Sequence, residues 1–325
     1  MKKKVYIANS IPKYVEEYIG RSCDYEIWDG SSKITREELL KNIKDVDGLI
    51  VFGHKIDEEL LNAAPKLKVV SNLSVGYDNF NIEAMKARGV IGTNTPYVLD
   101  DTVADLIFAL ILSASRRVVQ LDKFVRDGKW EKDIERSHFG LDVHGATLGI
   151  IGMGNIGEAV ATRGKFGFGM DILYHNRSRK LQAEKELGAK YCSLEELLRN
   201  SDFIVLMTPL TEDTKELISY KEFDMMKNTA IFINGSRGKT VNEEALIDAL
   251  NSNKIFAAGL DVFYKEPVDK NNPLLKMDNV VLLPHIGSAT GKTRDEMAML
   301  AAENMVKALC GEKPPTLVKE FKDIV

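Results

Sequence analysis

The sequence contains few of the residues on which disulfide-bonded and metal-binding proteins depend. Among its 325 residues there are only three cysteines, Cys23, Cys192 and Cys310, and five histidines. The cysteines lie far apart, with neither a pairing pattern nor the spacing of a zinc site. We therefore expect reduced thiols in a cytoplasmic protein, and the sequence predicts no metal centre.

Long hydrophobic runs and a strong net charge are also missing. No stretch approaches the roughly 18 apolar residues of a membrane-spanning helix, and the apolar run that begins the chain is too short for a signal peptide. The net charge is −4, and 28% of the residues are charged. This balance gives no general attraction to nucleic acids or anionic lipids, so we expect neither nucleic acid nor membrane as a partner.

The chain does contain a regular alternation of short apolar segments and amphipathic segments. In its first part, strands are predicted at residues 3–10, 24–30, 47–53, 67–76 and 90–96, and helices at 11–20, 34–43 and 81–89. A second series has predicted strands at 147–154, 170–175, 202–207, 229–235, 257–262 and 280–285, and helices such as 194–200 and 242–253. Alternation of this kind predicts an α/β protein in which helices cover parallel sheets.

Two longer helices separate these series. One is predicted at residues 101–112, with Asp100 or Asp101 as its N-cap, and one at 291–311, ending at Gly311. A chain of this length predicts two domains. Because the last helix is expected to return to the first domain, residues 1–98 and 293–325 form one discontinuous domain, and residues 99–292 form an inserted one.

A glycine-rich turn opens the inserted domain. The sequence Gly152-Met-Gly154-Asn155-Ile156-Gly157 follows the apolar strand TLGIIG and precedes a helical segment. In such a turn the first glycine permits a tight bend, the second lets a pyrophosphate approach the backbone, and the third lets helix and strand pack closely. The helix N-terminus adds free N–H groups. This placement predicts a Rossmann-type dinucleotide-binding domain.

The segment after the next strand indicates which dinucleotide is bound. NAD sites place a carboxylate at this strand end to bind the ribose hydroxyls, whereas here the chain continues Asn176-Arg177-Ser178-Arg179. A carboxylate would repel the 2′-phosphate of NADP, and arginine binds it. The sequence therefore predicts NADP(H) as the preferred cofactor, with NAD(H) possible. The alternative is a solvated loop with no role in cofactor choice.

Three chemically complementary residues follow strands of the same series. Arg237 lies after the strand AIFIN, Glu266 after AAGLDV, and His285 at the end of VVLLP. Loops at the carboxyl ends of parallel strands line ligand sites. A cation that binds a carboxylate, a histidine acid and a carboxylate that orients it are what carbonyl reduction requires. Each residue could instead be an ordinary loop residue. His54, after an earlier strand, could also face a cleft, although a structural role is favoured there.

These motifs resemble those of the D-isomer-specific 2-hydroxyacid dehydrogenases, closest to the glyoxylate/hydroxypyruvate reductases. The resemblance rests on NLSVGYDN, GTNTPYVLDDTVADL, TLGIIGMGNIG, NGSRGKTVNEEAL, AAGLDVFYKEPV and LLPHIGSATGKTR, which stand in the family's order. It implies two flavodoxin/Rossmann-like doubly wound parallel-sheet domains, with the cofactor domain inserted into the substrate domain through a hinge of crossing helices. It also implies a homodimer built mainly on the cofactor domain.

The resemblance assigns roles to individual residues. Arg237, Glu266 and His285 are similar to the family's catalytic trio. The backbone of Val75 and Gly76 is expected to bind the substrate carboxylate, and Ser288 to contact the substrate. The expected cofactor-binding residues are Thr102, Gly152, Gly154, Asn155, Ile156, Gly157, Asn176, Arg177, Ser178, Arg179, Thr208, Pro209, Asp261, which matches the acid that binds the nicotinamide carboxamide, and His285. These side chains are expected to meet in a cleft between the domains.

The implied activity is hydride transfer from NADPH to a small 2-oxo acid, glyoxylate or hydroxypyruvate, to give the D-2-hydroxy acid. A 2-ketogluconate reductase is an alternative, because it uses the same trio on a longer substrate. A corepressor-like scaffold that binds dinucleotide is an alternative of another class. The absence of a low-complexity tail disfavours the scaffold, and Glu266 disfavours a formate dehydrogenase, which transfers hydride without a proton.

Overall fold

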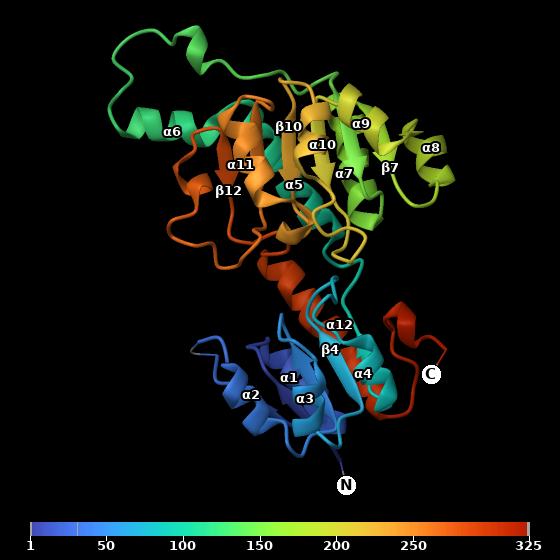
Figure 1. Ribbon diagram of the computed structural model, residues 1–325. Coiled ribbons are helices and arrows are strands. Elements are labelled where there is room, and N and C mark those ends of the chain that lie inside the picture. The colour runs from blue at the N-terminus through green and yellow to red at the C-terminus, as the bar shows by residue number, and fades with distance from the viewer. Residues whose placement is uncertain (1, 31, 324–325) are drawn as a thin grey trace. The chain divides into compact units, whose positions relative to one another are not determined.

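The chain forms two compact units, each built around one parallel β-sheet. The computed structural model describes residues 2–30 and 32–323. Unit 1 comprises Met1–Leu99 and Ala289–Val325, and unit 2 comprises Asp100–Ser288. Helices cover both faces of each sheet (Figure 1). The predicted α/β class with two doubly wound parallel sheets is confirmed.

Unit 1 contains a five-stranded sheet with the order β2-β1-β3-β4-β5. Its strands are β1 (Lys3–Ile7), β2 (Cys23–Ile27), β3 (Gly48–Val51), β4 (Val69–Asn72) and β5 (Ile91–Thr93). Its helices are α1 (Lys13–Ser22), α2 (Arg36–Asn42), α3 (Glu58–Ala63), α4 (Ile82–Ala87) and α12 (Gly291–Leu309). All of the strand pairs are parallel.

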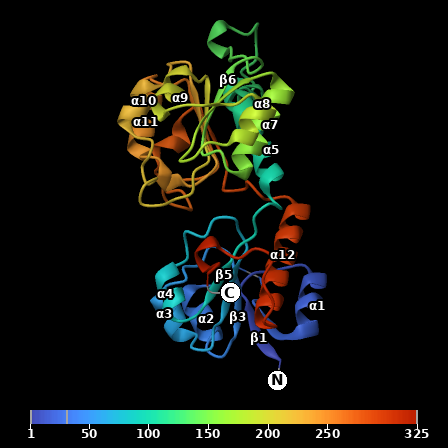
Figure 2. The same ribbon diagram turned by 90° about the vertical axis from the view of Figure 1, so that its right-hand side faces the viewer.

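Successive residues of each strand in unit 1 enter different cores, because side chains alternate across a sheet. Leu49 and Val70 pack with α2, α3 and α4 on one face. Ile50 and Val69 pack with α1 and α12 on the other face. Figure 2 shows α1 and α12 on one side of this sheet and α2, α3 and α4 on the opposite side. Strands buried on both faces explain the continuous apolar runs of the sequence.

Unit 2 contains a seven-stranded parallel sheet with the order β12-β11-β10-β9-β6-β7-β8. Its strands are β6 (Thr147–Ile151), β7 (Asp171–His175), β8 (Lys190–Tyr191), β9 (Phe203–Leu206), β10 (Ile231–Asn234), β11 (Ala257–Leu260) and β12 (Val280–Leu282). Its helices are α5 (Asp100–Ser115), α6 (Val118–Arg126), α7 (Asn155–Phe168), α8 (Leu181–Leu187), α9 (Leu194–Asn200), α10 (Tyr220–Met225) and α11 (Glu243–Asn251).

The sheet of unit 2 is also covered on both faces. Helices α9, α10 and α11 pack their buried leucines and Phe223 against Phe232 and neighbouring strand residues. On the other face, α5 lies along β10, β11 and α7. Phe108 of α5 stacks on Phe168 of α7, with 5.1 Å between the ring centroids. Packing on both faces therefore fixes the positions of the strand ends and of α5.

The structure differs from the prediction at one end of α5. The helix begins at Asp100 and continues to Ser115, so neither Asp100 nor Asp101 is its N-cap. Both carboxylates lie in the first turn, where negative charge interacts favourably with the helix dipole. Helices α3, α6, α8 and α10 were not predicted, and each of them has only six to nine residues. Helix α6 has no buried residue.

Helix α12 is joined to unit 1 by a buried asparagine. Asn304 is fully buried. Its Nδ2 donates to Asn94 O (3.2 Å) and Thr316 Oγ1 (2.7 Å), and its Oδ1 accepts from Thr316 N (2.9 Å). One side chain therefore satisfies backbone groups after β5 and near the end of the chain.

Replacing this asparagine should destabilise unit 1. Asn304→Ala leaves buried backbone groups unsatisfied, so we expect the free energy of unfolding to fall by about 2–3 kcal/mol. Urea denaturation followed by circular dichroism measures this change. Lys292→Ala, on the same helix with an 85% exposed side chain, is the matched control. Equal stability of the two variants would contradict the role of Asn304.

Candidate active site

Most predicted site residues of unit 2 follow strands at one edge of its sheet, whereas Thr102 lies in the first turn of α5. In this sheet β6 neighbours β9 on one side and β7 on the other, so the direction in which the chain adds strands reverses between β6 and β9. Open α/β sheets bind ligands at the carboxyl ends of the strands, at such a reversal. The glycine-rich turn follows β6, and Thr208 and Pro209 follow β9.

The glycine-rich turn has the geometry that a dinucleotide requires. Gly152 has φ +101°, and a Cβ there would lie 2.8 Å from the carbonyl carbon of Met207. At Gly157 a Cβ would lie 2.5 Å from Gly152 O, whereas a Cβ at Gly154 would meet no atom within 4 Å. The turn is therefore tight at its first and third glycines and open at the second. Helix α7 begins inside this sequence, at Asn155, so the third glycine lies in the first turn of the helix.

Polar groups around this turn have the chemistry of a dinucleotide site. Thr208 Oγ1 is buried and has no hydrogen-bond partner among the residues that the structure describes. The backbone N–H of Thr208 would be 2.9 Å from a Cβ at Gly152, so this threonine borders the turn. Burial raises the pKa of Asp100, and a hydrogen bond from Asn155 opposes that rise. These residues fit an NAD(P) cofactor.

The segment after β7 carries two exposed arginines, of which one is in an ion pair with a carboxylate of the described residues. Asn176 Nδ2 donates to Met153 O (3.4 Å), which ties the strand end to the glycine-rich turn. Arg177 and Ser178 are exposed. Arg179 is also exposed, and its guanidinium is bound to Glu184 of α8, with 3.0 Å between Nε and Oε1. The sequence predicted two equivalent arginines, whereas a carboxylate partner distinguishes Arg179 from Arg177.

Glu266 and His285 form a direct hydrogen bond. The distance between His285 Nδ1 and Glu266 Oε2 is 2.7 Å. The second carboxylate oxygen of Glu266 accepts from Phe263 N at 3.0 Å, which fixes the orientation of the carboxylate. With Nδ1 bound to Glu266, the other ring nitrogen, Nε2, is left to exchange a proton with a ligand.

Several contacts keep Glu266 ionised. Burial acts to raise the pKa of this carboxyl. The hydrogen bonds from His285 and Phe263, together with the charges of His285 and Arg237, outweigh burial and place the pKa below the ordinary 4.5. Because the pKa of Glu266 is depressed in the folded protein, the carboxylate is charged in its contact with His285 at pH values above that pKa. This charged contact is lost as the pH falls through the depressed pKa.

Asp261 holds the loop that carries His285. It is buried, and its two oxygens accept from Ile286 N and Gly287 N, each at 2.8 Å. Burial raises the pKa of Asp261, against the effect of these hydrogen bonds. His285 itself has φ +56°, a conformation that non-glycine residues rarely adopt. The sequence predicted Asp261 only as a cofactor ligand and did not indicate this anchoring role.

Arg237 is placed beside Glu266 by close backbone packing. Its carbonyl accepts from Asn234 Nδ2 (3.1 Å) and Thr240 Oγ1 (2.6 Å). At the next residue, Gly238, any Cβ would overlap the carbonyl group of Phe263. Only glycine therefore lets the Arg237 loop lie against the segment that leads to Glu266. The sequence GSRGK contains Gly238, but the sequence analysis assigned no role to this glycine.

In unit 1, the loop after β4 is fixed by two asparagines. Asn94 Nδ2 donates to Val75 O, and Asn72 Nδ2 donates to Gly76 O, both at 2.8 Å. The peptide group between Val75 and Gly76 is planar and trans, so its C=O and its N–H point in opposite directions. Because Asn94 binds Val75 O, the N–H of Gly76 points away from Asn94. The sequence identified Val75 and Gly76, whereas Asn72 and Asn94 were missed because an asparagine after a strand is common in turns.

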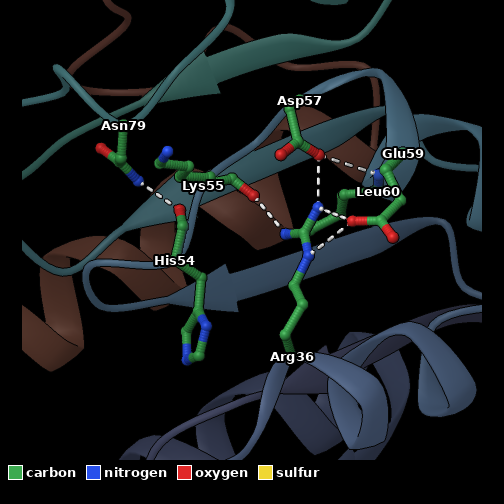
Figure 3. Close-up of polar contacts among 7 residues, drawn as sticks. All are labelled: Arg36, His54, Lys55, Asp57, Glu59, Leu60 and Asn79. Carbon is green, nitrogen blue, oxygen red and sulfur yellow. Dashed lines mark hydrogen bonds and ion pairs between the residues drawn. The ribbon is translucent and has the colours of Figure 1, made fainter.

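His54 is a buried structural residue of unit 1 with no partner in the catalytic set. Burial, followed by the charges of Lys33 and Arg36, lowers its pKa. Its Nε2 has no hydrogen-bond partner within the described ranges. Figure 3 shows its imidazole directed away from Asn79, which donates to the backbone oxygen of His54 at 2.8 Å.

The described residues form neither a metal site nor a membrane-spanning helix. Residues 2–30 and 32–323 include no cluster of three or more His, Cys, Asp or Glu side chains able to bind a metal ion. In the same part of the chain, no helix combines the length and apolarity needed to cross a membrane. The three cysteines are free thiols, and Cys23 and Cys192 are buried.

Comparison with known proteins identifies close relatives. A glyoxylate reductase of Pyrococcus horikoshii is 49% identical over 323 residues, which cover 98% of this chain and 96% of that protein. Glyoxylate/hydroxypyruvate reductase B of Yersinia enterocolitica is 46% identical over 311 residues, covering 96% and 95% of the two chains. The solved structure of an NADPH-dependent glyoxylate/hydroxypyruvate reductase from Sinorhizobium meliloti, in complex with NADP and malonate, has a TM-score of 0.85 and 31% identity and covers 98% of each chain.

A family comparison agrees with these relatives. Residues 108–287 match the D-isomer specific 2-hydroxyacid dehydrogenase, NAD binding domain. This match lies within unit 2 and contains the glycine-rich turn, Arg237, Glu266 and His285. The chain is therefore an oxidoreductase of the D-isomer specific 2-hydroxyacid dehydrogenase family, and unit 2 carries its NAD(P)-binding domain.

Proposed function

We propose that this protein reduces glyoxylate and hydroxypyruvate to the corresponding D-2-hydroxy acids, with NADPH as the preferred cofactor. The observation that carries the proposal is the 2.7 Å hydrogen bond between His285 Nδ1 and Glu266 Oε2, with Arg237 contributing a positive charge to the same carboxylate. A histidine acid, an orienting carboxylate and an arginine together serve the reduction of a 2-oxo acid. The named relatives are reductases of this kind.

In the proposed mechanism, His285 is the general acid. When bound, the reduced nicotinamide supplies the hydride that is added to the carbonyl carbon of the substrate. His285 donates the proton on Nε2 to the carbonyl oxygen, on which negative charge develops. Glu266 accepts the hydrogen bond from Nδ1, which keeps the ring oriented. Asp261 holds the backbone of the same loop.

The substrate carboxylate requires separate binding groups. The guanidinium of Arg237 is suited to a bidentate contact with a carboxylate. The N–H of Gly76 is directed away from the Asn94 contact, which makes it available to an anionic ligand. Ser288, next to the loop anchored by Asp261, would contribute a hydroxyl. These residues would bind and orient the 2-oxo acid while His285 transfers its proton.

The proposed preference for NADPH rests on charge at the end of β7. From Asn176 to Lys180 the chain has no acidic residue, so nothing in this segment repels a 2′-phosphate. Arg177 is exposed, whereas Glu184 already binds Arg179. Arg177 is therefore the main proposed phosphate ligand, with Ser178 beside it, and Arg179 contributes less. The Sinorhizobium meliloti relative is NADPH-dependent.

A homodimer is also proposed, because α6 and the following segment expose large apolar side chains. Val118, Val119 and Trp130 are 50%, 54% and 63% exposed, and Phe139 is 57% exposed. In Figure 1 this part of unit 2 extends away from its sheet. A cluster of exposed apolar groups on one arm is typical of a protein interface. A second copy of the chain would cover it.

Replacing the proposed acid tests the mechanism. His285→Ala should lower kcat by about 100- to 10,000-fold, because general acid catalysis contributes that much, with a small change in KM. Arg237→Met should also raise KM, since it removes a substrate contact. NADPH oxidation with glyoxylate or hydroxypyruvate, followed at 340 nm, measures both. His144→Ala, an exposed histidine, is the control. Wild-type turnover in His285→Ala would refute the assignment.

The pH profile separates the role of Glu266 from that of His285. Because the pKa of Glu266 is below 4.5, its protonation should not limit kcat/KM until the pH falls below that value. Glu266→Gln removes the ionisable carboxyl, so the loss of activity that comes from protonating Glu266 at low pH should disappear from the profile. Initial rates between pH 4 and pH 10, at about one-unit steps, measure this change. An acid side of the profile that is the same in Glu266→Gln and in the wild type would exclude this role of Glu266.

The two arginines should differ in their effect on cofactor choice. Arg177→Ala should raise KM for NADPH about tenfold or more and leave KM for NADH nearly unchanged, because only NADPH carries the phosphate. Arg179→Ala should have a smaller effect, since Glu184 already binds that guanidinium. Steady-state kinetics with both cofactors gives the comparison. Equal losses with NADPH and NADH would contradict a 2′-phosphate site.

Polar substitutions on the apolar arm should disrupt the proposed dimer. Val119→Asp combined with Trp130→Ser introduces charge and removes buried apolar area at the proposed interface, so we expect a monomer. Light scattering coupled to gel filtration measures the mass. Tyr14→Ser, at a 49% exposed side chain on α1, is the control. A wild-type protein that is already monomeric would exclude the homodimer.

A further inference from the structure

A hollow in unit 1 lies at the amino ends of the strands and is separate from the residues described above. It has a volume of about 660 Å³ and is lined by Asp47, Pro65, Lys66, Leu67, Lys68, Arg88, Gly89 and Ile91. Small-molecule sites have volumes of about 300–1,000 Å³. The lining residues precede or begin β3, β4 and β5, whereas the Val75–Gly76 loop follows the carboxyl end of β4. The hollow is therefore at the opposite edge of the same parallel sheet.

The carboxylate that lines this hollow is already bound by two lysines. Asp47 Oδ1 lies 3.1 Å from Lys3 Nζ and 3.7 Å from Lys68 Nζ, and Asp47 Oδ2 accepts from Lys4 N at 3.1 Å. The neighbouring ammonium group of Lys3 lowers the pKa of Lys68, because the two positive charges repel each other. One carboxylate balances only one of the two lysines, so this group keeps a positive charge.

A second pair of lysines shares Asp45 in the same way. Lys4 Nζ lies 2.5 Å from Asp45 Oδ2, and Lys66 Nζ is bound to Asp45 Oδ1. The hydrogen bonds from Lys4 and Lys66 lower the pKa of Asp45 to about 2, so this carboxylate is ionised at neutral pH. Again one negative charge faces two positive charges. Lys66, which lines the hollow, brings part of this excess to it.

Arg88 adds a cation whose hydrogen-bond partners among the described residues are neutral. Its Nη1 donates to Leu61 O at 2.9 Å, and its Nη2 donates to Asn62 Oδ1. Both partners belong to α3, so they fix the position of the guanidinium at the wall of the hollow. A guanidinium has five N–H donors, so donors remain for a ligand.

The hollow and the residues bound to its lining therefore have an excess of three positive charges. This excess arises from five cations and two carboxylates, namely Lys3, Lys4, Lys66, Lys68, Arg88, Asp45 and Asp47. The net charge of the whole chain has the opposite sign, −4. Arginine binds phosphate oxygens through paired N–H groups, and lysine binds them as a point charge. A compact anion with several charges suits this arrangement better than a single carboxylate does.

We propose that this hollow binds a small anion that carries a diphosphate group. Such a group matches the excess of three positive charges at the hollow. Arg88 donates to phosphate oxygens, and Lys66 and Lys68 contribute their charges beside it. The site goes beyond the proposed function, because it uses none of the residues assigned to the 2-oxo acid or to the cofactor. Since the anion binds only the folded chain, it also stabilises unit 1.

Calorimetric titration with inorganic pyrophosphate tests the proposal. The protein is first saturated with NADPH, so that the cofactor site is occupied. The wild-type protein should bind pyrophosphate, and the Kd should rise between about 0.02 M and about 0.5 M NaCl, because salt screens exposed charges. Arg88→Gln should raise the Kd about tenfold or more, because it removes a charged donor. Lys292→Gln, at an 85% exposed side chain on α12, is the control and should leave the Kd unchanged.

A matched pair of substitutions keeps the test valid if Arg88→Gln does not fold. Gly89 lines the hollow and has φ +66°, and a Cβ at this residue would meet no atom within 4 Å. Asparagine and aspartate adopt such a conformation more readily than most side chains, and the two have nearly the same shape. Gly89→Asp places a negative charge at the hollow and should raise the Kd about tenfold. Gly89→Asn should change the Kd much less.

The outcomes decide both the location and the class of the ligand. A Kd that rises in Arg88→Gln or Gly89→Asp, but not in Lys292→Gln or Gly89→Asn, supports the site. Absence of binding to the wild-type protein at low salt, or equal Kd values in all of the variants, overturns it. A loss in Arg177→Ala alone places the anion at the cofactor site and also overturns it. Tighter binding of citrate, whose charges are on carboxylates, overturns the diphosphate class. None of these outcomes depends on the reduction of glyoxylate, so the proposed function is tested separately.

Discussion

The parallel alignment of β10, β11 and β12 is the constraint on which the candidate site depends. Their registers pair Asn234 with Leu260 and Leu260 with Leu282, so the three strands end at one edge of the sheet. The loops that follow carry Arg237, Glu266 and His285. Residues separated by almost fifty positions in the chain thereby contribute to one electrostatic environment. Without this alignment, the hydrogen bond between Glu266 and His285 could not form.

Contacts to the backbone then fix the positions of the loops that carry His285 and Arg237. The two oxygens of Asp261 accept from the loop after His285, and the absence of a side chain at Gly238 lets two loops touch. A buried carboxylate that accepts two N–H groups gives a rigid support, because losing either bond would leave a buried charge less well satisfied. The strained φ of His285 is held by this support. The position of His285, the proposed acid, is therefore fixed by residues that need not touch the substrate.

Both sheets have a reversal of strand order, the position at which open α/β sheets bind ligands. In unit 2 the reversal between β6 and β9 is bordered by glycines and by a threonine hydroxyl that has no hydrogen-bond partner among the described residues, which suit a phosphate-bearing cofactor. In unit 1 the reversal between β1 and β3 is bordered by the side-chain carbonyl of Asn9 and by Arg294 over the aromatic ring of Phe52. The fold fixes where a ligand can bind, and the side chains determine which ligand it is.

The sequence by itself determined the fold class and the order of most strands, because apolar runs and glycines act locally. It did not place the short helices α3, α6, α8 and α10. It placed the glycine-rich turn between a strand and a helix, and it identified Arg237, Glu266 and His285 as candidates. It could not distinguish Arg177 from Arg179, since the partner of Arg179 is Glu184 on the next helix. It also did not reveal the anchoring role of Asp261 or the hollow at Arg88. These depend on contacts between distant segments, and only the tertiary structure decides which side chains such contacts leave free to bind a ligand.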